Sequence, residues 1–204
     1  MAIRVHHLNQ SRSQRIVWLL EELGLEYELV RYQRDAVTHF APPELKKIHP
    51  MGKSPLLEDN GVLIEESGAI AQYLCDTYGN GRLLPAAGTP DALRHLQLMH
   101  FAEGSAMLPL LLRIYVGRLG EGGAPLQGRI DSEVVSHFDY LESILHSSGY
   151  FIGESLTAAD VMLSFPVSLA VQQQEAGRWP KLKAFMDMVK ARPAWQRAMA
   201  LTGG

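Results

Sequence analysis

The chain has 204 residues, of which 47% are hydrophobic and 20% charged, and its formal net charge at pH 7 is −3. This balance excludes a disordered chain, and the slight acidic excess gives no basic footprint for nucleic acid. One cysteine, Cys75, excludes an internal disulfide and a multi-cysteine zinc site. No window reaches the roughly 18–20 apolar residues of a spanning helix, and Arg4, His6 and His7 interrupt any signal-peptide pattern at the start. We therefore expect a soluble, cytoplasmic protein that has no nucleic-acid or membrane partner.

The first third of the sequence predicts short strands that alternate with helices. Alternating apolar and polar residues predict strands, and apolar residues three or four apart predict helices. The pair Asn60-Gly61 joins two strand-like runs and is the strongest short-range hairpin signal. The expected elements are a strand over 2–7, a helix over 16–23 that ends at Gly24, a strand over 27–32, at most one helical turn over 44–48, strands over 56–58 and 62–65, and a helix from 67 that stops near 79. Their order is βαβ, a long connection, and then ββα.

The rest of the chain predicts helices alone. A stretch rich in glycine, proline and alanine over 81–90 is typical of a linker. We then expect one long helix over 91–119 with a kink at Pro109, and a buried helical stripe from Leu126 to Leu145. Helices over 158–174, 180–191 and 193–201 complete the set. The predicted fold class is α+β, with a mixed domain over 1–80 and an all-helical domain over 91–204.

Four segments carry a resemblance to a known family. Their order and spacing resemble cytosolic glutathione transferases, and the serine-type bacterial and fungal members look closest. The resemblance covers essentially the whole chain and implies a thioredoxin-like N-terminal domain followed by an all-α helical bundle. It also implies glutathione as co-substrate, no metal, and a homodimer. The segments are NQSRSQR at 9–15, HPMGKSPL at 49–56, IEESGAI at 64–70 and GESLTAAD at 153–160.

Two of these segments have the chemistry that glutathione requires. The tripeptide carries two carboxylates, an amine and a thiol, so its site needs donors, a counter-charge and a backbone edge. The resemblance implies that Ser67 binds the γ-glutamyl carboxylate and Glu66 lies on the amine side. It further implies that Ser54, before a cis Pro55, pairs its main chain with the cysteinyl unit, and that Lys53 lies near the glycyl carboxylate. From the residues alone, Ser67 could instead cap a helix, and Lys53 could be a solvated surface lysine.

A single hydroxyl is enough to activate the thiol. A free thiol has a pKa near 8.5, so only about 3% is ionised at neutral pH. Lowering that pKa by about two units requires ~2.7 kcal/mol in favour of the anion. One hydrogen bond to a charged group contributes ~1.5–3 kcal/mol, so one well-aimed donor suffices.

Three polar side chains after the first strand are candidates for this donor. Ser11 lies four residues before Arg15, which is the spacing seen in serine-type members, and we predict it as the catalytic residue. The amide of Asn9 is the alternative donor, and Ser13, directly before the helical run, is expected to cap that helix. Arg12 could add positive potential near the sulfur.

Other members of the family are excluded or differ at single positions. The first tyrosine is Tyr27 and the only cysteine is Cys75, so the tyrosine- and cysteine-type members do not match. Cys75 is expected to pack in a helix. Relatives of the theta and phi kind often carry a histidine where this chain has Phe40, and His39 comes one residue early.

The helical domain is expected to hold the second substrate. Met107, Leu111 and Tyr115 share one helix face and are predicted to wall a pocket for a hydrophobic electrophile, although the same stripe could be ordinary core. Thr157 and Asp160 have capping-box spacing. We therefore predict a glutathione transferase that conjugates the thiolate to hydrophobic electrophiles. The alternatives are a glutathione-dependent peroxidase or disulfide reductase on the same site, and a non-catalytic binding or regulatory module.

Overall fold

The computed structural model describes residues 3–173 and 177–203, and the chain divides into two compact units. Met1–Arg82 and Ala191–Gly204 form the first unit, and Leu83–Lys190 form the second. The change of unit after Arg82 falls inside the linker predicted over 81–90. The C-terminal helix, however, groups with the first unit, whereas the sequence prediction placed it in the helical domain.

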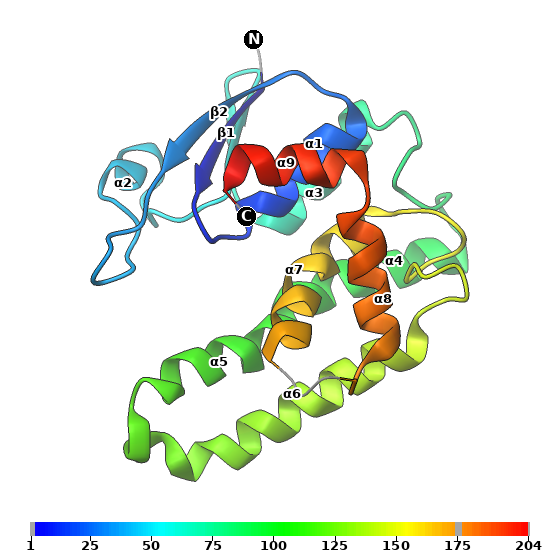
Figure 1. Cartoon of the computed structure of the whole chain (residues 1–204). Helices are drawn as coiled ribbons and strands as arrows, with labels where there is room; N and C mark the ends of the chain where they lie inside the picture. The colour runs from blue at the N-terminus through cyan, green and yellow to red at the C-terminus, as the bar shows by residue number, and fades with distance from the viewer. Residues whose placement is uncertain (1–2, 174–176, 204) are drawn as a thin grey trace. The chain divides into compact units, whose positions relative to one another are not determined.

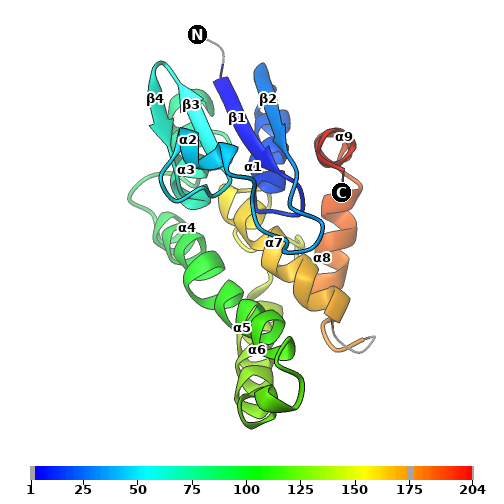
Figure 2. The same cartoon turned by 90° about the vertical axis from the view of Figure 1, so that its left-hand side faces the viewer.

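The first unit is built on a four-stranded mixed sheet with the order β2-β1-β3-β4, seen in Figure 2. β1 pairs parallel with β2 and antiparallel with β3, and β3 and β4 form an antiparallel hairpin around Asn60-Gly61. The predicted order of elements is confirmed, with β1 ending one residue later than expected and its predicted start at Ala2 lying outside the described residues. The strands are β1 (Ile3–Leu8), β2 (Tyr27–Tyr32), β3 (Leu56–Asp59) and β4 (Val62–Ile64).

Three helices pack on this sheet: α1 (Ser13–Leu23), α2 (Glu44–Ile48) and α3 (Ser67–Tyr78). Because side chains alternate along a strand, His7 of β1 faces the side covered by α1, and Leu8 faces the opposite side. Leu8 forms a small core with Leu45 of α2 and Leu56 of β3. Gly24 ends α1 in the left-handed conformation, with φ 69°, as the sequence predicts.

The last helix, α9 (Pro193–Thr202), lies along α1, as Figure 1 shows. Trp18 of α1 meets Trp195 edge-on, with ring centroids 5.0 Å apart. Two guanidinium groups close the contact, since Nε of Arg192 lies 2.6 Å from Oε1 of Glu22 and Arg197 pairs with Glu21. An aromatic pair combined with two ion pairs explains why this helix belongs to the first unit.

The second unit is helical throughout its regular structure. Its helices are α4 (Pro90–Phe101), the π-helical segment η1 (Ala102–Ala106), α5 (Met107–Gly117), the 3₁₀ turn η2 (Gly120–Gly123), α6 (Ala124–Ile144), α7 (Ala158–Gln173) and α8 (Pro180–Lys190). The predicted end of one helix at Gln174 lies outside the described residues.

Two expectations for this unit are wrong in detail. The long helix is not one α-helix kinked at Pro109, because a π-helical turn over Ala102–Ala106 interrupts it and α5 ends at Gly117. Proline has no N–H to bond the carbonyl four residues earlier, and that carbonyl belongs to Ser105, inside the π turn. The buried stripe of α6 starts at Ile130, because Leu126 in the first turn is 55% exposed.

The predicted capping motif lies at the start of α7 and is fully buried. The carboxylate of Asp160 accepts from the main-chain N–H groups of Thr157 and Phe151, at 2.7 and 2.8 Å. The Thr157 hydroxyl also donates to this carboxylate, at 2.7 Å, whereas the hydroxyl of a usual capping box accepts from the main-chain N–H three residues later. Burial raises the pKa of Asp160 to about 6 in spite of these donors.

None of the helices in the described part of the chain has the length and apolar character needed to cross a membrane.

Candidate functional site

Ser11 lies in the loop between β1 and α1, where it is only 4% exposed. Its Oγ lies 2.7 Å from Oγ of Ser13 and accepts from the main-chain N–H of Ser13 at 3.3 Å. Ser13 does not cap α1, because it is the first residue of the helix and Arg12 occupies the N-cap position. Instead the Ser13 hydroxyl points inward, 2.7 Å from Nδ1 of His7.

Asn9, the alternative donor, forms hydrogen bonds with the segment after β2. Its carboxamide oxygen accepts from the main-chain N–H of Arg34 at 2.7 Å, and its carbonyl accepts from Nε of Arg34 at 3.1 Å. These bonds fasten the segment after β2 to the end of β1. The amide NH₂ of Asn9 remains the part of this side chain that could donate to a ligand.

The first turn of α3 combines a buried positive charge with the N–H groups at the start of the helix, which have no intrahelical partner. Arg15, 1% exposed, donates from Nη2 to Oγ of Ser67 at 2.8 Å. Ser67 is the first residue of α3, so the alternative in which it caps the helix is wrong. The N-cap position belongs to Glu66, whose φ of 65° is unusual for a residue with a side chain. A helix N-terminus next to a guanidinium favours an anion.

Ser54 ties the connection before β3 to the end of β1. Its hydroxyl donates to the carbonyl of His6 at 2.8 Å and accepts from the N–H of Leu8 at 3.1 Å. The Ser54-Pro55 peptide bond is cis, and Lys53 beside it is exposed. Ser54 is thus fastened to the strand that leads into Ser11.

β1 and α1 therefore join three of the predicted glutathione contacts. Ser54 bonds to the end of β1, Ser11 follows that strand, and Ser67 bonds to Arg15 of α1. All three hydroxyls belong to the first unit.

The other polar groups near the strands have structural partners. His6 and His7 lie on opposite faces of β1, and His6 contacts the hydroxyl of Tyr32 and the carboxylate of Glu58. In the described residues no three His, Cys, Asp or Glu side chains come together to hold a metal ion. Cys75 is buried, and burial raises the pKa of its thiol to about 12, so it is a packed helix residue as expected.

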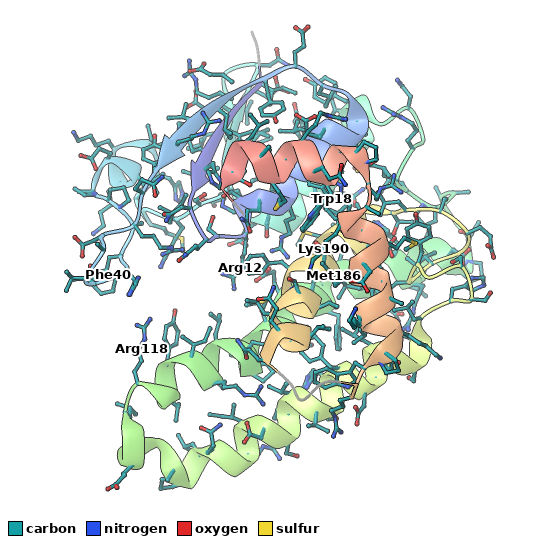
Figure 3. The ribbon with its side chains drawn as sticks, viewed as in Figure 1. Arg12, Trp18, Phe40, Arg118, Met186 and Lys190 are labelled. Atoms are coloured by element: carbon teal, nitrogen blue, oxygen red, sulfur yellow. The ribbon has the colours of Figure 1, made fainter. Side chains whose placement is uncertain are left out.

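Phe40 and His39, where the sequence differs from theta and phi relatives, lie in the loop after β2. Phe40 is 72% exposed there, and Figure 3 shows it on this loop. His39 is also exposed, with φ 58°, and its carbonyl accepts from Nη1 of Arg34 at 3.0 Å.

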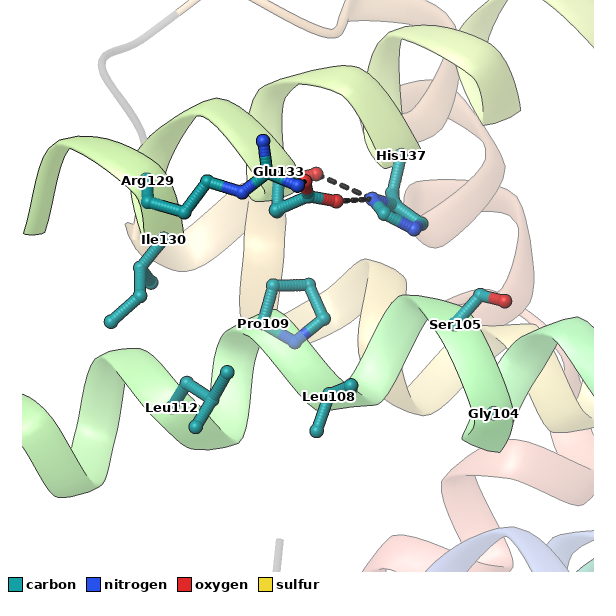
Figure 4. Close-up of a pocket in the computed structure, with 9 residues that line it drawn as sticks. All are labelled: Gly104, Ser105, Leu108, Pro109, Leu112, Arg129, Ile130, Glu133 and His137. Atoms are coloured by element: carbon teal, nitrogen blue, oxygen red, sulfur yellow. Dashed lines mark hydrogen bonds and ion pairs between the residues drawn. The ribbon is translucent and has the colours of Figure 1, made fainter. Parts of the chain in front are cut away.

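The three residues that were predicted to wall the electrophile pocket lie on α5 and differ in how exposed they are. Met107 is buried, Leu111 is half-buried, and Tyr115 is 58% exposed. A hollow of about 350 Å³ is lined instead by Leu108, Pro109 and Leu112 on the adjacent face of α5. Figure 4 shows these three side chains together with the lining residues of α6. Sequence reasoning missed this hollow, although the four-residue spacing of Arg129, Glu133 and His137 was a signal for one polar wall. Its lining residues are Gly104, Ser105, Leu108, Pro109, Leu112, Arg129, Ile130, Glu133 and His137.

Comparison with known proteins agrees with this architecture. Residues 3–76 match the family model of the glutathione S-transferase N-terminal domain, and residues 127–197 match that of the C-terminal domain. The chain therefore belongs to the glutathione S-transferase family, which confirms the predicted resemblance and fold.

The relatives are similar along most of their length. Glutathione S-transferase 3 of Schizosaccharomyces pombe is 36% identical over 208 residues, which are 94% of this chain and 84% of the relative. Glutathione S-transferase 1 of Saccharomyces cerevisiae is 35% identical over 195 residues, which are 85% and 83% of the two chains. The crystal structure of a glutathione S-transferase from Actinobacillus pleuropneumoniae is 35% identical, with a TM-score of 0.90 over 99% of this chain and 93% of the other.

Proposed function

We propose that this protein is a glutathione transferase. It binds glutathione in the first unit, holds the sulfur as a thiolate through the Ser11 hydroxyl, and transfers it to a hydrophobic electrophile. The sulfur forms a bond to carbon by nucleophilic addition or by aromatic substitution, and in the second case a leaving group departs. The relatives that match this chain over most of their length are named glutathione S-transferases.

The hydrogen bond from Arg15 to Ser67 carries this proposal. It joins α1 to the first turn of α3, so the short segment that bears the Ser11 hydroxyl also carries the guanidinium that contacts the proposed anion-binding residue, Ser67. A ligand with a thiol at one point and a carboxylate at another matches this pair of groups. Glutathione has both.

The remaining contacts follow the tripeptide along its length. We assign the γ-glutamyl carboxylate to Ser67, with Arg15 behind it, and the amine to the exposed carboxylate of Glu66. The main chain of Ser54, before Pro55, pairs with the cysteinyl unit, and Lys53 neutralises the glycyl carboxylate.

Replacing Ser67 with alanine should weaken glutathione binding at least tenfold. The variant loses a hydrogen bond to a carboxylate, and such bonds contribute ~1.5–3 kcal/mol, which corresponds to a factor of about ten or more. Isothermal titration calorimetry measures the change in Kd. Ser147→Ala, which removes an exposed hydroxyl of the helical unit, is the matched control. An unchanged Kd in Ser67→Ala would remove this residue from the site.

The electrophile is assigned to the face of α5 that carries Leu111 and Tyr115, with Met107 buried beneath it. Tyr115→Ala should raise the KM for an aryl halide about fivefold, because an aromatic contact of roughly 1 kcal/mol is lost. The Kd for glutathione should not change. The comparison variant is Leu108→Ala, which alters the hollow on the adjacent face. If only Leu108→Ala raises the KM, the electrophile binds in that hollow instead.

The family is also the basis on which we propose an assembly and a location for the protein. We propose a homodimer, since leucines are exposed along one stretch of the helical unit: Leu93 at 60%, Leu96 at 53%, Leu108 at 54% and Leu119 at 64%. Burying apolar side chains such as these against a partner would stabilise a dimer. We also propose that the protein is cytoplasmic.

A further inference from the structure

A chain of three buried polar groups leads inward from the predicted catalytic hydroxyl. Oγ of Ser11 lies 2.7 Å from Oγ of Ser13, which lies 2.7 Å from Nδ1 of His7. Ser11 is 4% exposed, Ser13 0% and His7 2%, so water does not compete for these contacts. All three residues belong to the first unit. The proposed function uses only the first of them.

The other ring nitrogen of His7 sets the direction of this chain. A main-chain hydrogen bond with Thr202, at the end of α9, raises the pKa of His7, which means that the ring donates to that carbonyl. Since Nδ1 faces Ser13, the donor is Nε2. In this tautomer, neutral His7 accepts at Nδ1 from Ser13, and the Ser13 oxygen accepts from Ser11. In this arrangement the hydroxyl hydrogen of Ser11 points inward, toward Ser13.

Donation to a sulfur anion requires the reverse direction. Each serine has a single hydroxyl hydrogen, and oxygen or nitrogen lone pairs 2.7 Å apart repel unless a hydrogen lies between them. If Ser11 donates to sulfur, Ser13 must donate to Ser11, and Nδ1 of His7 must donate to Ser13. With Nε2 also protonated, His7 is then an imidazolium. The carbonyl of Leu8, 3.3 Å from Oγ of Ser13, is a longer and weaker alternative acceptor.

We propose that Ser11, Ser13 and His7 form a relay that moves the glutathione thiol proton to Nδ1 of His7. The S–H proton passes to Oγ of Ser11 as the Ser11 proton passes to Ser13 and the Ser13 proton passes to His7. The S–H bond breaks, an N–H bond forms, and the complex neither gains nor loses a proton. The product is a thiolate that accepts from Ser11, paired through the relay with an imidazolium. His7 and Ser13 are thus positioning residues that act on sulfur through Ser11.

The groups around His7 act on its protonation in both directions. Burial lowers its pKa, the hydrogen bond to Thr202 opposes this, and the positive charge of Arg31, opposite it on β2, lowers it further. Together these influences favour the neutral ring before glutathione binds. The carbonyl groups at the C-terminal end of α9 and the negative charge of the thiolate then favour the imidazolium.

The direct test is the protonation state of His7 in the whole protein, read by nitrogen NMR of histidine labelled with ¹⁵N. His7→Gln identifies the His7 signals by their loss. Glutathione at neutral pH should convert these signals to the imidazolium pattern, and S-methylglutathione, which has no thiol proton, should leave them neutral. Conversion by both ligands would overturn the relay.

The inference rests on the proposed function, but the two can fail separately. Ultraviolet absorbance of the bound thiolate is measured on the same samples. If no thiolate forms, both proposals are wrong. If thiolate forms while His7 stays neutral, the relay alone is wrong and Ser11 acts without it.

Ser13→Ala interrupts the relay and leaves Ser11 in place. The apparent pKa of the bound thiol is taken from the pH dependence of kcat/KM for the electrophile at saturating glutathione. It should rise by about one unit, which lowers the rate at neutral pH about tenfold. At high pH, where solvent can take the proton, the rate should recover, and the KM for glutathione should change less than twofold. Ser13→Thr, which keeps the hydroxyl, should restore the profile. A loss that is the same at every pH would indicate a structural role and contradict the relay.

Discussion

Replacing Ser11 with alanine is expected to raise the pKa of bound glutathione by about 1–2 units and to lower kcat/KM at neutral pH about 10- to 100-fold. A hydrogen bond to a charged group contributes ~1.5–3 kcal/mol, and each pKa unit corresponds to about 1.4 kcal/mol. Ser11 is nearly buried beside Ser13, so water cannot easily take its place. Thiolate absorbance as a function of pH measures the shift directly.

Two further variants make this test specific. Ser11→Thr keeps a hydroxyl and should retain most of the activity. Asn9→Ala should have the smaller effect on the thiol pKa, because its carboxamide oxygen already holds Arg34. If Asn9→Ala gives the larger shift, Asn9 is the thiolate donor, and the transferase activity stands with a different residue.

Replacing Asp160 with alanine should destabilise the helical unit by about 3–5 kcal/mol. The change leaves three donors buried without a partner: the N–H of Phe151, the N–H of Thr157 and the Thr157 hydroxyl. Each such group costs ~1–3 kcal/mol, although the costs do not add fully. Urea unfolding followed by circular dichroism gives the free energy. Asp187→Ala, which removes an exposed carboxylate from a pair with Lys183, should hardly move the midpoint.

The pH dependence of this effect has a definite sign. Burial raises the pKa of Asp160 to about 6, above the usual value near 4, so the folded protein prefers the protonated carboxyl. The stability contributed by that preference is fully present below about pH 4 and is lost as the pH rises through 6. The difference in free energy of unfolding between wild type and Asp160→Ala should therefore narrow from pH 4 to pH 7. A difference that widens over this range would contradict the raised pKa.

The elements of the first unit could be predicted well because their signals are local. Gly24 ends α1 and Asn60-Gly61 forms the hairpin, and each needs only its neighbours in sequence. The role of Ser13 could not be predicted in this way. Its position before an apolar run predicts a cap, but its partner is His7, on a strand whose pairing and facing depend on the whole sheet.

The same distinction holds for the site and for the helical unit. Ser11 and Ser67 could be proposed from motif spacing, but the buried bond from Arg15 that connects their two segments could not. In the long helix, the sequence predicted a kink at Pro109, and the irregularity that the structure shows lies before this proline. Its form, a π-helical turn before the proline, depends on how the carbonyls one turn earlier find partners. Local sequence patterns do not show which partners those carbonyls will find.

The packing of α9 on α1 has a consequence for biosynthesis. The ion pair between Arg192 and Glu22 spans 170 residues, so in chain topology the helical unit is an insertion within the unit that holds Ser11. During synthesis, Trp18 cannot contact Trp195 until the ribosome has translated the helical unit that lies between them in the sequence. The unit that holds Ser11 therefore starts to be translated before the helical unit but is completed after it, and the inserted helices can already be folded when α9 packs on α1.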